Sequence, residues 1–344
     1  MKKKRVTIAD IAEELGLSTA TVSNVIHGKT KKISDETVKR VQELLEKRDY
    51  MPRMADILLE QNDTRIIGIV VNDHKKYEGH VLEDGFISAT INTLSREIDK
   101  AGCFMMIKVT TQWDEIVRFA SMRNMEGLVI IGFCEQDYKK LRECMGIPFV
   151  AYEGFFREAQ KICNLTIDNY GGGYQAGKYL KSMGHEKILC ISDNDESMDS
   201  ERIKGFMDAM GTLPAGFMQT PFSKEERMRF YQEKMNEILE YTAIFALSDY
   251  YAIEIMNYLR LHGVRVPEDI SIMGFDDSPL CNYCSPALTT VRQGITLRAK
   301  KAIEILINLK NGSEKRSMME FPVTIIERES VKNINVYASN IYKI

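Results

Sequence analysis

The stretch at residues 6–28, "VTIADIAEELGLSTATVSNVIHG", contains two short helical patterns separated by a glycine. In the first pattern, apolar residues recur at a spacing that places them on one helical face: Ile8, Ile11, Ala12 and Leu15. Thr7 can cap this helix, and Asp10, three residues further on, is placed as its partner in a near capping box. Gly16 can end the helix, because glycine readily adopts the left-handed conformation of a helix C-terminus. This pattern predicts a helix-turn-helix.

The second helical pattern has two contrasting faces. Ser18 can cap it, and Val22, Val25 and Ile26 share its apolar side. Small polar or short side chains share the opposite side: Ala20, Ser23, Asn24 and His27. A third helix from Ser34 can buttress the pair through an apolar stripe: Val38, Val41, Leu44 and Leu45. The polar side could enter a DNA major groove, and composition equally permits a structural cap with a solvated face.

The 344-residue chain is long enough for two or three domains, and its composition, 44% hydrophobic and 28% charged, is typical of a globular protein. The net charge is −3, yet residues 1–53 hold 12 Lys and Arg against 8 Asp and Glu. A small basic module therefore precedes an acidic body, which favours nucleic-acid binding by the module. No segment approaches the roughly 18 apolar residues of a membrane span. No apolar region follows the basic start, so we expect a cytoplasmic protein without membrane contact.

The seven cysteines are scattered in apolar runs and predict buried thiols rather than a disulfide framework. The CxxC at Cys281 and Cys284 has no second pair at metal-ligand spacing. Because a closed zinc site needs about four ligands, we expect no metal here. We expect no cofactor either.

From residue 65 onward, short apolar runs alternate with longer amphipathic patterns. The runs are "IIGIVV", "CFMMIKV", "GLVIIG", "PFVAY", "LTID", "KILCIS", "AIFALS" and "ISIMGF". Such alternation predicts parallel sheets covered by helices on both faces, and about 265 residues of it predict two sheets. The expected architecture is a small all-α helix-turn-helix headpiece followed by an α/β domain of two doubly wound parallel-sheet subdomains.

Polar residues stand at the ends of four of these runs: Asp73, Glu153, Ser248 with Asp249, and Asp276 with Asp277. In open α/β sheets, ligands bind beyond the carboxyl ends of the strands. We therefore expect a polar cleft suited to a ligand with many hydroxyl groups or with amines.

The sequence "VTIADIAEELGLSTATVSNVIHGKTKKISDETVKRVQELLEKRDYMP" resembles the DNA-binding headpiece of the LacI family of bacterial transcriptional regulators almost continuously. The resemblance implies a homodimer on a pseudo-palindromic double-stranded DNA operator. It implies that Thr19, Ala20 and Asn24 read base edges. It also implies that a further set of side chains holds the phosphate backbone: Thr7, Ser18, Thr21, Ser23, His27, Ser34 and Thr37.

Two features depart from the family pattern. The family most often has Arg where this chain has Asn24, and Asn can pair bidentately with adenine whereas Arg favours guanine. In the segment that resembles the family's hinge helix, Leu59 matches the position of a minor-groove wedge. Asp56 and Glu60 would bring carboxylates toward the negative potential of that groove, which predicts shallower docking. An ordinary flexible linker is the alternative.

The body resembles the family's effector domain, itself similar to periplasmic sugar-binding proteins, in "IDNYGGGYQAGKYL", "RIKGF", "GVRVPEDISIMGFDDSPL" and "SPALTTVRQ". The resemblance implies the following parts: a headpiece, 1–50; a hinge or linker, 51–63; an N-subdomain, 64–162 plus 293–318; a C-subdomain, 163–292 plus 319–332; and a tail, 333–344. The chain would cross between the subdomains three times, and a small effector, expected to be a carbohydrate, would bind between them.

Carried over by position, the effector-binding residues would be Glu153, Arg202, Ser248, Asp249 and Asp276, with Asp73 at the end of the first strand. Phe86 and Phe222 are further candidates, because sugar sites combine aromatic faces with polar groups. Each has a structural alternative. Arg202 could only pair with a carboxylate, Asp249 could cap a helix, and the phenylalanines could be core.

The loop "NDHKKYEGHVLEDGF" is longer than the corresponding family loop and carries a cluster of polar side chains: His74, Lys75, Lys76, Tyr77 and His80. The charges could simply be solvated, or the loop could form a lid over the ligand.

Two other classes of function compete with a DNA-binding repressor. A solute-binding or sensor protein with a weakened DNA-binding role would suit the body alone. An enzyme would also suit a polar cleft, but the chain has no P-loop, no GxGxxG after a strand, no HExxH and no GxSxG. We therefore expect no catalytic residues and a regulator controlled by a small polar molecule.

Overall fold

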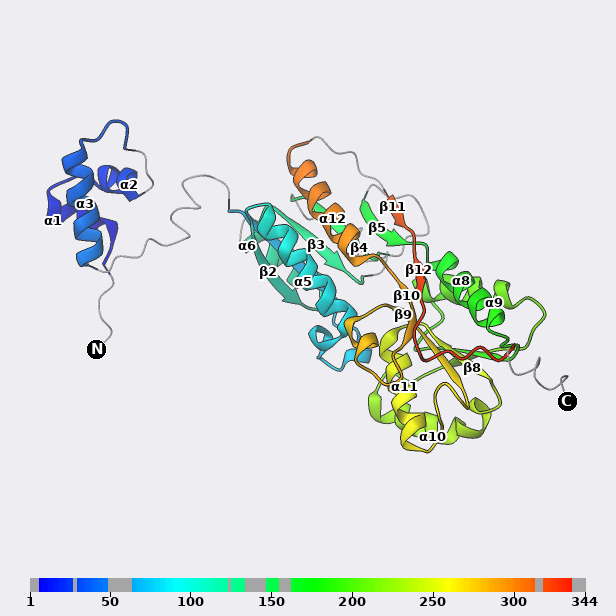
Figure 1. Ribbon diagram of the computed structural model, residues 1–344. Coiled ribbons are helices and arrows are strands. Elements are labelled where there is room, and N and C mark those ends of the chain that lie inside the picture. The colour runs from blue at the N-terminus through cyan, green and yellow to red at the C-terminus, as the bar shows by residue number, and fades with distance from the viewer. Residues whose placement is uncertain are drawn as a thin grey trace, which may run out of the picture. The chain divides into compact units, whose positions relative to one another are not determined.

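The computed structural model describes residues 6–26, 30–48, 64–122, 125–133, 147–154, 162–312 and 318–335 (Figure 1). The chain divides into two compact units at the junction of Arg65 and Ile66. Among the described helices, none is long and apolar enough to cross a membrane.

The smaller unit contains three helices, α1 (Ile8–Leu15), α2 (Thr19–Ile26) and α3 (Asp35–Lys47). Thr7 caps α1 in a full capping box with Asp10, and Gly16 ends the helix at φ 65°. The predicted apolar faces form one core, whose fully buried members are Ile11, Ala12, Val22, Val25, Val41 and Leu44. The predicted three-helix module is confirmed.

The first sheet of the larger unit has the strand order β11-β5-β4-β3-β1-β2. Its strands are β1 (Ile66–Val71), β2 (Phe104–Val109), β3 (Gly127–Ile131), β4 (Phe149–Tyr152), β5 (Cys163–Ile167) and β11 (Met318–Phe321). All neighbouring strands run parallel. Helices α5 (Gly85–Lys100) and α12 (Ile295–Lys310) pack in the core on one face, and α6 (Trp113–Met122) packs on the other.

The second sheet has the strand order β12-β10-β9-β8-β6-β7. Its strands are β6 (Ile188–Ser192), β7 (Ala215–Gln219), β8 (Ala243–Ala246), β9 (Ser271–Asp276), β10 (Thr289–Arg292) and β12 (Thr324–Ile326). Only the β10–β12 pair is antiparallel in this sheet. Helices α8 (Asn169–Ser182) and α9 (Ser197–Met210) cover one face, and α10 (Lys224–Ile238) and α11 (Asp249–Leu261) cover the other. The predicted pair of doubly wound subdomains, here called the first and second lobes, is confirmed.

All eight apolar runs form strands, and all but β2, which lies at a sheet edge and is partly exposed, are buried between helices. The sequence did not predict β7, β10, β11 or β12. Three of these, β7, β11 and β12, lie at sheet edges, where one side of the strand has no neighbour and the sequence need not be uniformly apolar.

The chain passes between the lobes after β5, after β10 and between β11 and β12. The expected subdomain boundaries at 162/163 and 318/319 therefore need correction. Strands β5 and β11 pair with each other in the first sheet, so the chain leaves that sheet only after Ile167 and Phe321. The remaining crossing follows Arg292, the last residue of β10.

Helices α8 and α9 approach each other closely at two glycines. A Cβ on Gly173 would lie 1.9 Å from the carbonyl oxygen of Arg202, and one on Gly205 would lie 2.0 Å from that of Tyr170. The "GGGY" stretch thus serves helix packing, and this packing sets the backbone position of Arg202.

We predict that Gly173→Ala destabilises the protein by about 1–3 kcal/mol, because the added methyl group must displace the backbone of α9. Thermal unfolding of the full chain measures this effect. Gln175→Ala, on the same helix, is the matched control and should change stability by no more than about 0.5 kcal/mol. Equal stability of both variants would contradict the close-packing argument.

Candidate effector pocket and DNA-facing helix

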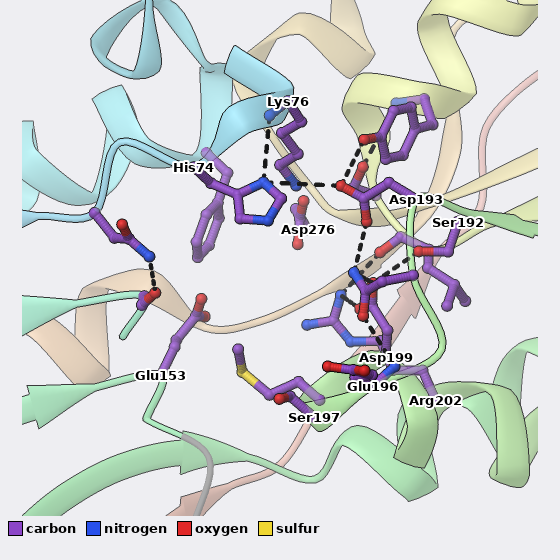
Figure 2. A pocket seen from close by; sticks show the side chains of 18 of the residues that line it. His74, Lys76, Glu153, Ser192, Asp193, Glu196, Ser197, Asp199, Arg202 and Asp276 are labelled. Atoms are coloured by element: carbon purple, nitrogen blue, oxygen red, sulfur yellow. Dashed lines mark hydrogen bonds and ion pairs between the residues drawn. The ribbon is translucent and has the colours of Figure 1, made fainter. Parts of the chain in front are cut away.

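A pocket of about 410 Å³ lies between the two lobes of the larger unit. It gathers the ends of several strands, including β1, β4, β6 and β9, as the strand-end argument predicts. Figure 2 shows Glu153, Asp276 and Arg202 around one space, with His74 and Lys76 above them in the view. Six of the eight predicted effector residues line this pocket: Phe86, Glu153, Arg202, Phe222, Ser248 and Asp276.

Glu153 follows β4 with a left-handed backbone, φ 60°. Its Oε1 accepts a hydrogen bond from Nη2 of the fully buried Arg298, at 2.6 Å. The carboxylate is therefore held at the cleft by a buried cation of the same lobe.

Arg202 is fixed by its own lobe on three sides. Its Nε donates to Oδ1 of Asn169 at 2.9 Å, and its Nη1 donates to the carbonyl oxygen of Leu247 at 2.8 Å. The guanidinium stacks over the ring of Phe275 at 3.9 Å, and Asp199 lies 3.7 Å from Nη1. Arg202 therefore lines the pocket and also lies close to a carboxylate, so the two interpretations of this residue hold together.

Asp276 ends β9 with φ 123° and accepts a hydrogen bond from Nε2 of Gln293. Burial raises the pKa of Asp276 well above its ordinary value, and the nearby Asp249 adds to this shift through like-charge repulsion. Asp276 therefore favours a ligand group that donates hydrogen bonds or carries positive charge.

The prediction that Asp249 contacts the effector needs correction, because this residue does not line the cleft pocket. Its carboxylate accepts hydrogen bonds from the hydroxyl of Thr290 at 2.6 Å, the backbone N–H of Ser278 at 2.7 Å and the thiol of Cys281 at 3.0 Å. Asp249 does not cap its helix either, because Ser248 is the N-cap of α11. The carboxylate instead ties the start of α11 to the segments after β9 and in β10.

Asp73, like Asp249, is absent from the residues that line the pocket. The prediction that Asp73 contacts the effector is therefore also corrected. The residues around Asp73 do line the pocket: Asn72, His74, Lys76 and Tyr77. The side chain of Asn72 donates to the carbonyl oxygen of Gly132 at 2.8 Å. The end of β1 therefore contributes to the pocket through the neighbours of Asp73.

The long loop after β1 folds over the pocket through two short 3₁₀ helices, η1 (Lys75–Tyr77) and η2 (Val81–Glu83). The ring of His74 packs edge-on against Phe222 of the other lobe, with centroids 5.4 Å apart, and Tyr77 meets Tyr250 at 6.2 Å. Burial lowers the pKa of His74, so the imidazole is neutral near pH 7. These contacts favour the lid interpretation over a solvated loop.

Lys76 brings a cation to the pocket. Its Nζ lies 5.5 Å from the ring centroid of Tyr251 in the second lobe. Burial disfavours the charge, but the phenols of Tyr77 and Tyr251 and the carboxylate of Asp193 outweigh this effect and raise the pKa of Lys76. Although burial opposes ionisation of Asp193, Lys76 and the hydroxyl of Tyr251 hold its pKa below the ordinary range.

Sequence reasoning missed Asp193 and Gln293 as pocket residues. Asp193 directly follows the predicted strand "KILCIS", so the strand-end rule applied to that run would have found it. Gln293 follows β10, which the sequence did not predict as a strand, so no comparable signal was present.

In the smaller unit, the predicted DNA-facing side of α2 is exposed at Thr19, Ala20 and Asn24. Four of the expected phosphate-contacting hydroxyls lie in pairs at the starts of α2 and α3. Ser18 Oγ lies 2.8 Å from Thr21 Oγ1, and Ser34 Oγ lies 2.8 Å from Thr37 Oγ1. The predictions for His27, Leu59, Asp56 and Glu60 lie outside the described residues. No group of three or more metal-ligating side chains occurs within the described ranges.

Comparisons with known proteins agree with both units. A family model described as bacterial regulatory proteins, lacI family, matches residues 7–53, and one described as a periplasmic binding protein-like domain matches residues 178–331. The HTH-type transcriptional repressor PurR of Vibrio vulnificus (strain CMCP6) is 30% identical over 96% of this chain and 99% of its own.

Solved structures share the fold. A lac repressor dimer bound to operator and the anti-inducer ONPF matches with a TM-score of 0.80 at 21% identity, covering 96% of this chain and 100% of its own. A periplasmic binding protein/LacI transcriptional regulator from Alkaliphilus metalliredigens QYMF, complexed with D-xylulofuranose, matches with a TM-score of 0.67 at 26% identity. That match covers 78% of this chain and 99% of the solved one.

A helix-turn-helix unit joined to a two-lobed ligand-binding unit defines a DNA-binding transcriptional repressor, which is not an enzyme. The chain belongs to the lacI family of bacterial regulatory proteins.

Asp249 gives a prediction on pH. Burial raises the pKa of Asp249 to about 6, above the value of about 3.9 expected in an unfolded chain. Between about pH 4 and about pH 6, the carboxyl group of Asp249 is protonated in the folded chain and ionised in the unfolded chain. The group therefore stabilises the fold fully below about pH 4 and loses this contribution as the pH rises through about 6.

We expect the melting temperature of the wild type to rise relative to that of Asp249→Asn as the pH falls from about 7 to about 4. Thermal scans at matched ionic strength measure the difference. Glu186→Gln, at an exposed position, is the control. A difference between wild type and Asp249→Asn that stays constant with pH would show that Asp249 does not titrate in this way.

Proposed function

We propose that this repressor binds a pseudo-palindromic operator as a homodimer, and that a sugar or sugar derivative bound between the lobes sets its operator affinity. The observation that carries the proposal is the pocket, which combines Glu153, Asp276 and Arg202 with the aromatic faces of Phe86 and Phe222. Its volume of about 410 Å³ suits a small polar molecule.

The chemistry of the pocket supports a sugar. Carboxylates accept hydrogen bonds only, while arginine donates only. A sugar hydroxyl can donate to Glu153 or Asp276 and accept from Arg202, and the C–H face of a sugar ring can pack on Phe222. The relative complexed with D-xylulofuranose adds support for this ligand class.

A purine base or nucleoside is the second candidate. Relatives that match nearly the whole chain at about 30% identity are named PurR. A purine also presents N–H donors that could meet Asp276 or Glu153, and a flat ring that could pack on Phe222. The two candidates differ in their chemistry and can be separated in one binding screen.

Control of DNA binding requires that the effector bind one lobe arrangement better than another, typically by about 1–3 kcal/mol. The pocket supports such coupling because its lining comes from both lobes: Glu153 from β4 of the first sheet, and Asp276 from β9 of the second. A ligand that touches both carboxylates would favour a closed arrangement of the lobes.

Exposed apolar side chains support the proposed homodimer. Leu82 is 44% exposed, Leu280 50%, Tyr283 84% and Leu261 85%. Leu261 and Leu280 line one hollow in the larger unit. Contiguous exposed apolar side chains mark protein interaction sites, and a second copy of the chain is the partner that a two-fold operator would require.

We expect at least one sugar in a panel of pentoses, hexoses, polyols and nucleosides to raise the melting temperature of the full chain. A ligand at 100 times its dissociation constant stabilises the folded state by about 2.7 kcal/mol. Asp276→Asn should weaken the effect, whereas Glu186→Gln should leave it intact. Stabilisation by purines with no response to any sugar would replace the sugar with the second candidate.

On DNA, we expect Asn24 to specify adenine at one position of each half-site, with about 1–3 kcal/mol of discrimination. Selection of bound sequences from a random pool measures this preference. Asn24→Arg should shift that position toward guanine. Gln42→Arg, which adds the same charge at an exposed position of α3, should strengthen binding without changing the selected sequence. Recovery of one consensus from wild type and Asn24→Arg would contradict base reading by this residue.

A further inference from the structure

A continuous chain of hydrogen bonds joins the two pocket carboxylates across the lobes. Glu153 Oε1 accepts from Arg298 Nη2 at 2.6 Å, and the same Nη2 donates to Gln293 Oε1 at 2.8 Å. The amide Nε2 of Gln293 then donates to Asp276 Oδ1. We call Glu153, Arg298, Gln293 and Asp276 the carboxylate bridge.

The members of the carboxylate bridge come from three parts of the fold. Glu153 directly follows β4 in the first lobe, and Arg298 lies in α12 of the same lobe. Asp276 ends β9 in the second lobe. Gln293 lies between β10 and α12, in one of the segments where the chain crosses between the lobes. The bridge therefore runs through a connection between the lobes.

The bridge is almost fully withdrawn from solvent. The exposed fraction is 0% for Arg298, 1% for Gln293, 8% for Asp276 and 9% for Glu153. The guanidinium of Arg298 also lies over the ring of Tyr152, 4.3 Å from its centroid. Hydrogen bonds between charged groups are strong in such surroundings, and removal of one partner leaves the other unsatisfied.

The chemistry of each position fits its neighbours. Arg298 can only donate and Asp276, when ionised, can only accept, so the residue between them must accept on one side and donate on the other. A glutamine amide does both. Leucine or methionine at position 293 would fill similar space but would break the chain of hydrogen bonds.

We propose that Arg298 and Gln293 are positioning residues that hold Glu153 and Asp276 at a fixed separation and so set the closed arrangement of the lobes to which the effector binds. The part of this inference that concerns the effector rests on the proposed function. The part that concerns the lobes does not, because all four members of the bridge and their hydrogen bonds belong to the chain itself.

The second lobe contains a control at the opposite ends of its strands. His185 is 2% exposed, and it lies between α8 and β6. Its Nδ1 lies 3.1 Å from Thr242 Oγ1, and its Nε2 lies 3.1 Å from the carbonyl oxygen of Lys332. His185→Leu therefore removes buried hydrogen bonds that stay within one lobe and do not line the cleft pocket.

The experiment measures the distance between the lobes in the full chain without ligand or DNA. Spin labels are attached to an azido-phenylalanine placed at Ser121 of α6 and at Lys178 of α8, both exposed. An azide avoids the seven native cysteines. Excess unlabelled chain ensures that double electron–electron resonance reports only pairs within one chain. Wild type, Arg298→Met, Gln293→Leu and His185→Leu are compared.

We expect Arg298→Met and Gln293→Leu to give longer and broader distance distributions than the wild type. His185→Leu should lower the melting temperature but keep the wild-type distribution. Gln293→Leu leaves the Arg298–Glu153 pair in place, so it tests the bridge even if Arg298→Met fails to fold. Wild-type distributions in both bridge variants, or equal broadening in His185→Leu, would overturn the proposal.

The same variants separate this proposal from the proposed function. If a sugar stabilises the wild type, both bridge variants should weaken its binding at least tenfold, and His185→Leu should not. If no sugar or purine stabilises any variant, the effector proposal fails, while the distance measurement still decides the role of the bridge in lobe arrangement.

Discussion

The larger unit depends on one constraint: its central strands are buried on both faces, so their charged groups lie where the strands end. Helices cover each sheet on both sides, and the interiors of the central strands accordingly carry no charged residue. Glu153, Asp193 and Asp276 all stand at or just beyond the carboxyl end of a strand. The pocket between the lobes is therefore the place where the fold can present charged groups to a ligand.

Backbone conformation directs these groups into the cleft. Glu153 and Asp276 have φ values of 60° and 123°, which non-glycine residues rarely adopt. Such conformations cost about 1–3 kcal/mol each and persist where the surrounding structure holds them. Here the bond from Arg298 to Glu153 and the bond from Gln293 to Asp276 supply that restraint. Glu153 and Asp276 thus each combine an unfavourable backbone conformation with a side-chain hydrogen bond that holds the carboxylate in place.

The pocket also balances opposing charges at close range. Burial raises the pKa of Asp276, and like-charge repulsion from Asp249 of its own lobe and from Glu153 of the first lobe adds to the shift. Arg202, Arg298 and Lys76 offset part of this negative charge, each from a different element. A ligand that donates hydrogen bonds to the carboxylates would relieve the remaining repulsion, which links ligand chemistry to the arrangement of the lobes.

The sequence by itself determined the local elements. The capping box at Thr7, the apolar faces of the three small helices and eight of the strands follow from periodicity, because each pattern lies within one segment. The same local signals, with the strand-end rule, identified Glu153 and Asp276. Resemblance to a family, rather than periodicity, pointed to Arg202 and Phe222.

Only the tertiary structure decided which of these groups meet. The tertiary structure placed Asp249 in a buried set of hydrogen bonds rather than in the pocket. It also paired β5 with β11 in one sheet and placed Lys76 next to the ring of Tyr251. It also joined Glu153 to Arg298, which is 145 residues away in the chain. Periodicity reports which face of an element is buried. Periodicity cannot predict which distant side chain completes a hydrogen bond, because the path of the chain between the lobes decides which segments lie next to each other.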